Sequence, residues 1–341
     1  MQKETLYGKT LDEIIAVTKR LGMPGFSAMQ IADWLYKKEI TTIDEMSNLS
    51  KKMKTMLSAE YEMGLSSPEA SQESNDGTKK YLYKVLDGKY IETAYIPGKT
   101  YSTICLSSQS GCKMGCKFCM TGKQGFQGSL SSGEILNQLR SLPEFRMVTN
   151  IVYMGMGEPL DNLEQVLKST EIMTSEWGYG WSPSRITVST VGLIKTLREF
   201  LEKSKCHLAV SLHSPFDEER RNLMPVQKTN SLADILRIIK DFHLSRQRRI
   251  SFEYILFKGL NDTPAHVREL TRILNGIRCR INIIRFHSFP GSPFVSPGDN
   301  EIEEFKNALN KKGILTTVRA SRGMDIQAAC GLLSTMTKNK L

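Results

Sequence analysis

The residues Cys112-Lys-Met-Gly-Cys116-Lys-Phe-Cys119 place three thiols within eight consecutive positions. An apolar, β-branched run at 103–107 precedes them and a helical pattern follows at about 131–141, so the cysteines occupy the loop between a predicted strand and its helix. In repeated strand–helix units, functional groups gather on such loops, at the carboxyl ends of the strands. The stretch therefore predicts an α/β fold and the position of a functional site within it.

The same alternation of strand-like and helix-like runs continues through most of the remaining chain. Strand-like runs lie at 103–107, 150–154, 185–190, 207–212, 249–256 and 280–286, with a last one near Leu315–Val318. Helix-like runs lie at about 131–141, 161–175, 193–203, 231–243, 263–275 and 299–312. Repeated β–α units predict a parallel sheet with helices outside it. Six units indicate a partial (β/α)6 TIM-like barrel, and an open doubly wound sheet is the alternative.

The first hundred residues show a different pattern. Helices are expected from about Leu11, from an N-cap at Ser27, and over 43–57. Aromatic and β-branched runs at 81–86 and 90–96 flank Asp87-Gly88, which is typical of a β-hairpin. The expected domains are a helical accessory domain at 1–70, a polar linker and hairpin at 71–100, the barrel at 101–320 and a C-terminal segment at 321–341.

The composition indicates a globular protein with an acidic partner. The chain has 341 residues and a net charge of +10, with no apolar run long enough for a membrane span and no secretion signal after Met1. Seven cysteines, an odd number with three of them clustered, argue against a secreted disulfide framework and predict a cytoplasmic protein. Residues 1–70 are almost neutral, so the positive charge lies in the remainder. Such an excess suits a polyanion such as RNA.

Three thiolates on one short loop can converge on one metal centre. A structural zinc site usually has four protein ligands, and the nearest candidate for a fourth, Cys105, lies within the preceding predicted strand. Three cysteine ligands suit a [4Fe–4S] cluster that leaves one iron open to a small molecule. Such an iron can bind S-adenosylmethionine (SAM), and an electron from the cluster then releases a carbon radical. The alternatives are a zinc loop and three unrelated thiols.

Further motifs accompany the cysteines. They are Cys105-Leu-Ser-Ser-Gln-Ser-Gly-Cys112, Phe118-Cys119-Met-Thr-Gly-Lys-Gln-Gly-Phe126, Met154-Gly-Met-Gly-Glu158-Pro159, Ser211-Leu-His213 and Arg322-Gly-Met-Asp-Ile-Gln-Ala-Ala-Cys330-Gly331. With these motifs the chain resembles, over essentially its whole length, the RlmN/Cfr family of the radical SAM superfamily. RlmN-type members methylate adenine C2 in 23S ribosomal RNA and tRNA, whereas Cfr-type members methylate C8. Pro159 and Lys123-Gln124 favour the RlmN type.

The resemblance also implies cofactors and partners. They are one [4Fe–4S] cluster held by Cys112, Cys116 and Cys119, two SAM molecules per turnover, and an electron donor such as flavodoxin or ferredoxin. The N-terminal helices resemble the accessory RNA-binding domain of the family, and a monomer is expected. An alternative of another class is a metal-stabilised RNA-binding module without catalysis.

SAM-binding residues are expected at the carboxyl ends of the strands. Gly157-Glu158 ends the second strand, where a carboxylate can accept a hydrogen bond from the ammonium group of the ligand. By resemblance, SAM is also contacted at the ends of the third, fourth and sixth strands, by Ser189, Ser211, Leu212, His213 and His287. The family usually has an asparagine at the position of His287, and an imidazole can also donate one hydrogen bond.

The resemblance assigns three catalytic residues. Cys330, near the C-terminus, is the thiol that receives the methyl group from the first SAM and carries it to the RNA. Cys105 resolves the resulting covalent protein–RNA adduct by forming a transient disulfide with Cys330. Glu92, on the second strand of the hairpin, is the proton acceptor. Cys206 and Cys279 match no functional position and are expected to be structural.

Overall fold

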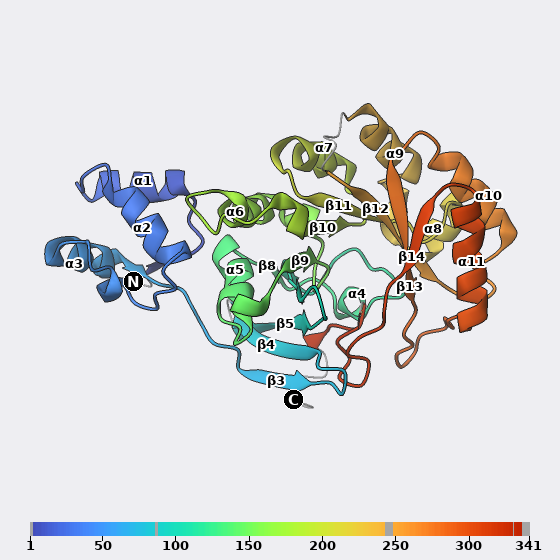
Figure 1. Ribbon diagram of the computed structural model, residues 1–341, viewed down its shortest axis with the longest axis horizontal. Helices are drawn as coiled ribbons and strands as arrows, with labels where there is room; N and C mark the ends of the chain where they lie inside the picture. Colours follow the sequence, from blue (N-terminus) through green and yellow to red (C-terminus); the bar gives the residue numbers. More distant parts are fainter. Residues whose placement is uncertain (1–2, 86–87, 243–247, 330, 336–341) are drawn as a thin grey trace.

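The computed structural model describes residues 3–85, 88–242, 248–329 and 331–335 (Figure 1). Its centre is a ten-stranded sheet in the order β14-β13-β12-β11-β10-β9-β6-β5-β4-β3. The strands from β6 to β14 pair in parallel, and the strands from β3 to β6 pair antiparallel. The helices lie around the outside of this curved sheet, from α5 to α11 (Figure 1).

The order of the parallel strands decides between the two expected architectures. In a doubly wound sheet the strand order reverses at a switch point, whereas here each parallel strand lies beside the next one in the chain. Successive crossovers of one hand then put all helices on one side, which is the arrangement of a barrel. The partial barrel is confirmed, and it is open because the next neighbour of β6 is the antiparallel β5.

The barrel elements agree with the predicted runs to within two residues at each end. The strands are β6 Thr103–Cys105, β9 Asn150–Tyr153, β10 Ile186–Thr190, β11 His207–Ser211, β12 Ile250–Leu256, β13 Cys279–Arg285 and β14 Leu315–Val318. The helices are α5 Ser132–Arg140, α6 Leu163–Thr174, α7 Ile194–Lys203, α9 Leu232–Asp241, α10 Pro264–Ile273 and α11 Asp299–Lys311. Shorter elements, which were not predicted, are β7 Gln109–Ser110, α4 Met120–Gln124, β8 Gly128–Ser129 and α8 Asp217–Leu223.

Periodicity worked in the barrel because local pattern and burial agree there. In α9 the buried side chains are Leu232, Ile235, Leu236 and Ile239, a spacing that puts them on one helix face. Every residue of β12 is buried, as expected for a central parallel strand that is covered on both faces. Within the described residues, no helix combines the length and the apolar character that crossing a membrane would require.

The N-terminal part departs from the predicted pattern in two places. Its elements are β1 Glu4–Thr5, α1 Leu11–Arg20, α2 Ser27–Tyr36, α3 Lys51–Glu60 and β2 Tyr61–Glu62. Ser27 is wrong as an N-cap, because it is the first residue of α2 and no side chain caps that helix. The run at 43–57 is not one helix: Ile43–Glu45 is a short 3-10 helix, and Ser50 caps α3 by accepting a hydrogen bond from the Met53 amide.

The predicted hairpin is present and belongs to a larger antiparallel extension of the sheet. Its strands are β4 Lys79–Val85 and β5 Lys89–Ile96, and Asp87 of the expected turn lies outside the described residues. The segment expected to be only a linker contains β3 Ala70–Glu73, which pairs with β4. Its sequence, Ala-Ser-Gln-Glu, has no β-branched residue, so only the pairing with β4 makes it a strand.

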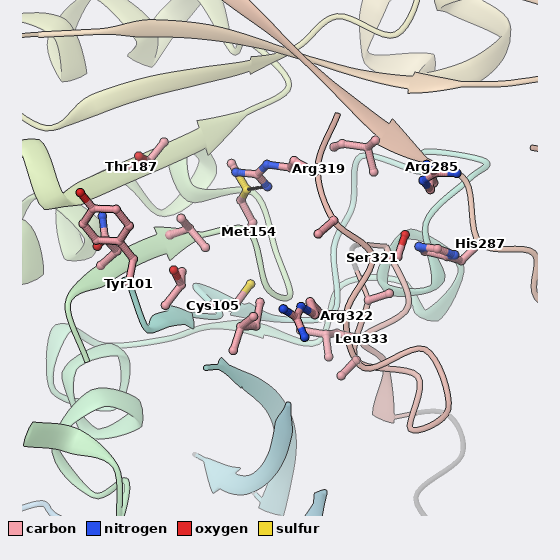
Figure 2. A pocket seen from close by; sticks show the side chains of 18 residues that line it. Tyr101, Cys105, Met154, Thr187, Arg285, His287, Arg319, Ser321, Arg322 and Leu333 are labelled. Atoms are coloured by element: carbon pink, nitrogen blue, oxygen red, sulfur yellow. Dashed lines mark hydrogen bonds between the residues drawn. The ribbon is translucent and has the colours of Figure 1, made fainter. Parts of the chain in front are cut away.

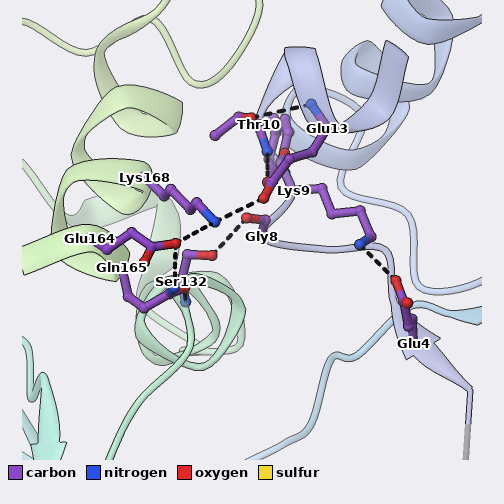
Figure 3. Close-up of polar contacts among 10 residues, drawn as sticks. Glu4, Gly8, Lys9, Thr10, Glu13, Ser132, Glu164, Gln165 and Lys168 are labelled. Atoms are coloured by element: carbon purple, nitrogen blue, oxygen red, sulfur yellow. Dashed lines mark hydrogen bonds and ion pairs between the residues drawn. The ribbon is translucent and has the colours of Figure 1, made fainter. Parts of the chain in front are cut away.

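Polar contacts join the N-terminal helices to the barrel (Figure 3). Lys168 on α6 forms an ion pair of 2.8 Å with Glu13 of α1, and the Ser132 hydroxyl donates to the Gly8 carbonyl at 2.7 Å. Gly8 has a positive φ, and a Cβ atom there would lie 2.3 Å from the Gly133 nitrogen, so glycine permits this close approach. One hydrophobic core runs from these helices into the sheet.

Candidate active site

A cavity of about 140 Å³ lies at the carboxyl ends of the parallel strands. Its wall brings together eight of the residues predicted from the sequence: Cys112, Cys116, Cys119, Gly157, Glu158, Ser189, Ser211 and His213. They come from the cysteine loop and from the ends of three strands, so the barrel topology alone unites them. Leu212 is not among the lining residues, because its side chain is fully buried in the hydrophobic core.

The three cysteines form one side of this cavity. Cys112 and Cys116 are buried and Cys119 is half-buried, in surroundings that include Met114 and Phe118. Burial raises the pKa of the Cys112 thiol to about 12, and the nearby Glu158 and Cys119 add to this shift. Burial also raises the pKa of the Cys116 thiol. Such thiols ionise readily only beside a strong positive charge, which bound iron supplies.

The three thiols suit an iron–sulfur cluster, which cysteine thiolates normally hold. A [4Fe–4S] cube spreads its irons over several ångströms, so its three sulfur ligands stand farther apart than those of one zinc. Cys105, the candidate for a fourth zinc ligand, lines a different cavity.

Glu158 is a buried carboxylate that faces the cysteines. One carboxylate oxygen accepts from the Leu160 amide at 3.0 Å and the other from the Val191 amide at 2.9 Å. Burial raises the pKa of Glu158 to about 7, although these hydrogen bonds oppose the shift. The carboxylate is therefore held in one orientation, and its charge would be stabilised by a cationic group of a ligand.

Gly157 and Gln109 set the position of Glu158. Gly157 has a φ of +99°, and a Cβ atom there would lie 2.7 Å from the backbone nitrogen of Gln109, so no other residue fits without a shift of the backbone. The Gln109 side chain accepts from the Glu158 amide at 2.9 Å and donates to Asp161 at 2.8 Å. The position of Glu158 thus depends on β7, which precedes the cysteine loop in the chain.

Arg220 on α8 connects the ends of β10 and β11 through hydrogen bonds. Its guanidinium is fully buried and donates to the carbonyls of Val191 at 2.8 Å, Ser211 at 3.0 Å and Leu212 at 3.2 Å. These bonds fix the backbone around the Ser211-Leu212-His213 motif. Leu212 therefore contributes through its carbonyl and its packing in the core.

His213 lines the cavity as a neutral side chain. Its φ is +55°, and its Nδ1 accepts from the Ile255 amide at 3.0 Å. Its ring packs edge-on against Phe118 of the cysteine loop, with 4.7 Å between ring centroids. Burial lowers the pKa of His213 to about 3, so the imidazole stays uncharged at neutral pH. The contact positions the cysteine loop against the end of β11.

A second, larger cavity of about 430 Å³ adjoins the first, and both share Met154 and Ile284 in their walls (Figure 2). Cys105 lies at its base on β6, and Arg319 and Arg322 enter it from the segment after β14 (Figure 2). His287 lines this second cavity rather than the first. Burial, assisted by Arg285, lowers the pKa of His287.

Glu92 lies in neither cavity wall in this structure. It is buried, and its carboxylate forms an ion pair of 3.0 Å with Lys80 and accepts from the Ser334 amide at 2.8 Å. Burial raises the pKa of Glu92, and the pairing with Lys80 opposes that shift. Ser334 belongs to the C-terminal segment, so this segment contacts the Glu92 carboxylate directly.

The C-terminal segment is anchored on both sides of Cys330, which itself lies outside the described residues. Upstream, the Ser74 hydroxyl and the Asn75 amide donate to the carboxylate of Asp325. Downstream, the segment is bound by α4, which begins directly after Cys119. The contacts there join Met120 to the Gly331 carbonyl at 2.8 Å, Thr121 to the Leu333 carbonyl at 2.6 Å, and Gln124 to both Ser334 and Thr335. The neighbours of Cys330 reach both cavities: Ala329 lines the second and Gly331 the first.

Several side chains at the site have no clear signal in the sequence. They are Gln109, Arg220, Lys80 and Glu253, which are all buried. Glu253, on β12, lines the first cavity, with one oxygen held by Ser251 and Asn282. A charged residue inside a strand that is mostly apolar, Ile250–Leu256, was the available hint for Glu253. Gln109 and Arg220 bind partners elsewhere in the chain, and Lys80 pairs with Glu92 on the neighbouring strand.

Comparisons with known proteins agree with this geometry. Residues 106–272 match the radical SAM superfamily, and residues 5–63 match the ribosomal RNA large subunit methyltransferase N-terminal domain. A "Probable dual-specificity RNA methyltransferase RlmN" of Bacteroides fragilis (strain YCH46) is 54% identical over 335 residues, which is 98% of this chain and 97% of that protein. The chain belongs to the RlmN family of radical SAM RNA methyltransferases.

Other RlmN-family members and a solved structure extend this similarity. The "Dual-specificity RNA methyltransferase RlmN" of Syntrophus aciditrophicus (strain SB) is 40% identical over 338 residues, which is 98% of this chain and 97% of that protein. The crystal structure of a radical SAM methyltransferase from Sphaerobacter thermophilus superposes with a TM-score of 0.90 at 36% identity, and covers 97% of this chain and 99% of that one. The expected family and its partial-barrel fold are thereby confirmed.

Proposed function

We propose that this enzyme methylates C2 of adenine in 23S ribosomal RNA and in tRNA, with two SAM molecules per turnover. The observation that supports this most strongly is the gathering of the cysteine loop, Glu158 and the anchored C-terminal segment around adjoining cavities, in a chain that belongs to the RlmN family. The N-terminal helices at 1–70 would form an accessory RNA-binding domain, and the enzyme would act as a cytoplasmic monomer. The electron donor would be a flavodoxin or a ferredoxin.

The chemistry of the target explains why an iron–sulfur site is needed. Adenine C2 lies between two ring nitrogens and is electron-poor, so it is not a nucleophile toward the methyl group of a sulfonium. A thiolate accepts that methyl readily. Cys112, Cys116 and Cys119 would hold the cluster, which when bound supplies an electron that makes SAM a source of a carbon radical. Adenine must leave its base stack to reach such a site.

The protein's own groups would perform the remaining tasks. Glu158, Ser189, Ser211 and His213 would orient SAM in the first cavity. Cys330 would take up the methyl group. Cys105 would later attack the Cys330 sulfur of the RNA adduct: the disulfide forms, the S–CH2 bond breaks, and its electron pair stays on the methylene carbon, which takes up a proton to become methyl. Glu92 would accept the C2 proton. His287, which lines the second cavity, would contact the part of SAM or substrate that extends there.

The product identifies the reaction. Purified, cluster-loaded enzyme should convert adenosine in unmodified 23S RNA and tRNA to 2-methyladenosine, as measured by mass spectrometry of RNA digests against synthetic standards. An otherwise identical reaction without reductant is the control. 8-Methyladenosine as the product would show a Cfr-type enzyme. Bound zinc, with no SAM cleavage under reductant, would show an RNA-binding module instead.

SAM binding should weaken at acidic pH because of Glu158. Its raised pKa of about 7 means that the carboxylate is ionised only above that pH, and an ammonium group binds the ionised form. Below pH 7, binding must first release a proton, so affinity should fall by about tenfold per pH unit. Titration calorimetry from pH 5.5 to 8.5 measures this affinity. The ligand is S-adenosylhomocysteine, which lacks the methyl group of SAM and cannot act as a methyl donor. Glu158→Gln should bind weakly without this dependence, and a retained slope would assign the titration to another group.

A further inference from the structure

A buried ion pair joins Lys80 and Glu92 beneath the C-terminal segment. The Lys80 ammonium lies 3.0 Å from a Glu92 carboxylate oxygen, and the two side chains are 8% and 3% exposed. Lysine is almost never buried to this extent unless it is paired with an acid. The buried surroundings strengthen the attraction between the two charges.

The strand register puts this pair on the same face of the sheet as Cys105. Lys80 is opposite Ala94, and Ala94 is opposite Cys105, so these three residues form one row across β4, β5 and β6. Glu92 precedes Ala94 by two residues and therefore points to the same face. Ala328 of the C-terminal segment packs against Ala94 and Cys105 on that face. The carboxylate, one of the two reactive thiols and the segment that carries the other thus lie on one surface.

Few groups face the Glu92 carboxylate. From β4 it meets the Lys80 ammonium, and from the C-terminal segment the Ser334 amide. From the other neighbours, the Ser107 hydroxyl donates to the main-chain carbonyl of Glu92 and the Met156 sulfur accepts from its amide. Among the described residues, Lys80 is the charged side chain that acts on this carboxyl. Without it, burial would favour the protonated form of Glu92, which cannot accept another proton.

We propose that Lys80 is a positioning residue that keeps Glu92 ionised and oriented toward the C-terminal segment. This inference rests on the proposed role of Glu92 as proton acceptor. In that step the C2–H bond of the protein–RNA adduct breaks, its electron pair stays on the adduct, and the proton goes to the Glu92 carboxylate. Lys80 takes no part in the proton transfer itself. The Ser334 amide donates a hydrogen bond to one oxygen of the same carboxylate. This hydrogen bond is lost when that oxygen takes up the proton.

Neutral replacements of Lys80 test the proposal. Lys80→Met removes the charge. Lys80→Gln also removes the charge but keeps a hydrogen-bond donor, so the second variant guards against loss of folding. Lys84→Met is the matched control, because Lys84 is an exposed lysine on the same strand. The first measurement is the single-turnover rate of RNA methylation from pH 5.5 to 9. The second is the infrared band of a protonated carboxyl group at pH 7, assigned by subtraction of the corresponding variant that also carries Glu92→Gln.

In both Lys80 variants, we expect the acidic limb of the pH–rate profile to shift to higher pH by about one pH unit or more. A protonated carboxyl band should appear at pH 7, whereas Lys84→Met should resemble the unmodified enzyme in both measurements. Methyl loading of Cys330, measured by peptide mass spectrometry, should be unchanged because it precedes proton removal. A variant that was merely less well folded would lose rate equally at all pH values.

Two contrary results have different meanings. If Glu92→Gln methylates RNA as fast as the unmodified enzyme, the proposed role of Glu92 is wrong. If Glu92→Gln is inactive but the folded Lys80 variants keep the original pH profile and show no carboxyl band, the role proposed for Lys80 is overturned and that of Glu92 stands.

Discussion

Cys116→Ala is expected to lose most bound iron and sulfide after anaerobic reconstitution, and RNA methylation should fall by at least about 10³-fold, because the radical chemistry has no other source. Cys116 is buried between Cys112 and Cys119 in the wall of the first cavity, so no solvent molecule replaces its sulfur easily. Iron and sulfide assays, the visible absorption spectrum and release of 5′-deoxyadenosine measure the effect.

The matched control for this experiment is Cys279→Ala. Cys279 is a half-buried thiol at the beginning of β13 and lines neither of the two cavities. This variant should keep its iron and its activity. A Cys116→Ala protein that retained a full cluster and cleaved SAM would contradict the assignment of the three-cysteine loop.

Replacement of Cys330 and replacement of Cys105 should block turnover at different steps. Cys330→Ala is expected to give no methylated protein and no methylated RNA, because no thiol is left to receive the methyl group. Cys105→Ala should still load the methyl group and attack the RNA, but the adduct cannot be resolved, so protein and RNA stay covalently joined. Turnover should fall to background in both, and denaturing gels with labelled RNA together with mass spectrometry separate the two results.

The packing around Cys105 makes this contrast specific. Cys105 contacts Ala94 and Ala328, so replacement by alanine removes a sulfur atom from a small cluster and leaves the strand pairing of β6 intact. Cys206→Ala, which alters a buried thiol in the main core, is the control for loss of volume. Normal turnover by Cys330→Ala or Cys105→Ala would disprove the two-thiol scheme.

Local patterns were sufficient for most of the barrel. The apolar periodicity of α9 and the mostly apolar run of β12 each identify their element, because the side chains that define the pattern are also those that pack in the core. The same reasoning failed for β3, where pairing with β4 imposes strand structure on a polar sequence. It also failed at 43–57, where the Ser50 cap begins a new helix.

The functional site was predictable from the sequence only in part. Cysteine spacing and the motifs at strand ends identify the lining of the first cavity, because each lies within a short stretch of sequence. The partners of those residues are far away along the chain: Gln109 binds the amide of Glu158, and Arg220 binds the carbonyl of Val191. No spacing rule reveals such contacts, since they depend on how the strands are ordered in space.

The sequence by itself determined the family through its motifs, the order of the barrel strands and helices through short-range periodicity, and the thiols and carboxylates available for chemistry through residue type. Only the tertiary structure decided that the sheet curves into an open barrel, that His287 lines the second cavity, and that Lys80 pairs with a buried Glu92 beneath the C-terminal segment. These features arise from strand order, strand register and burial, which local sequence patterns do not specify.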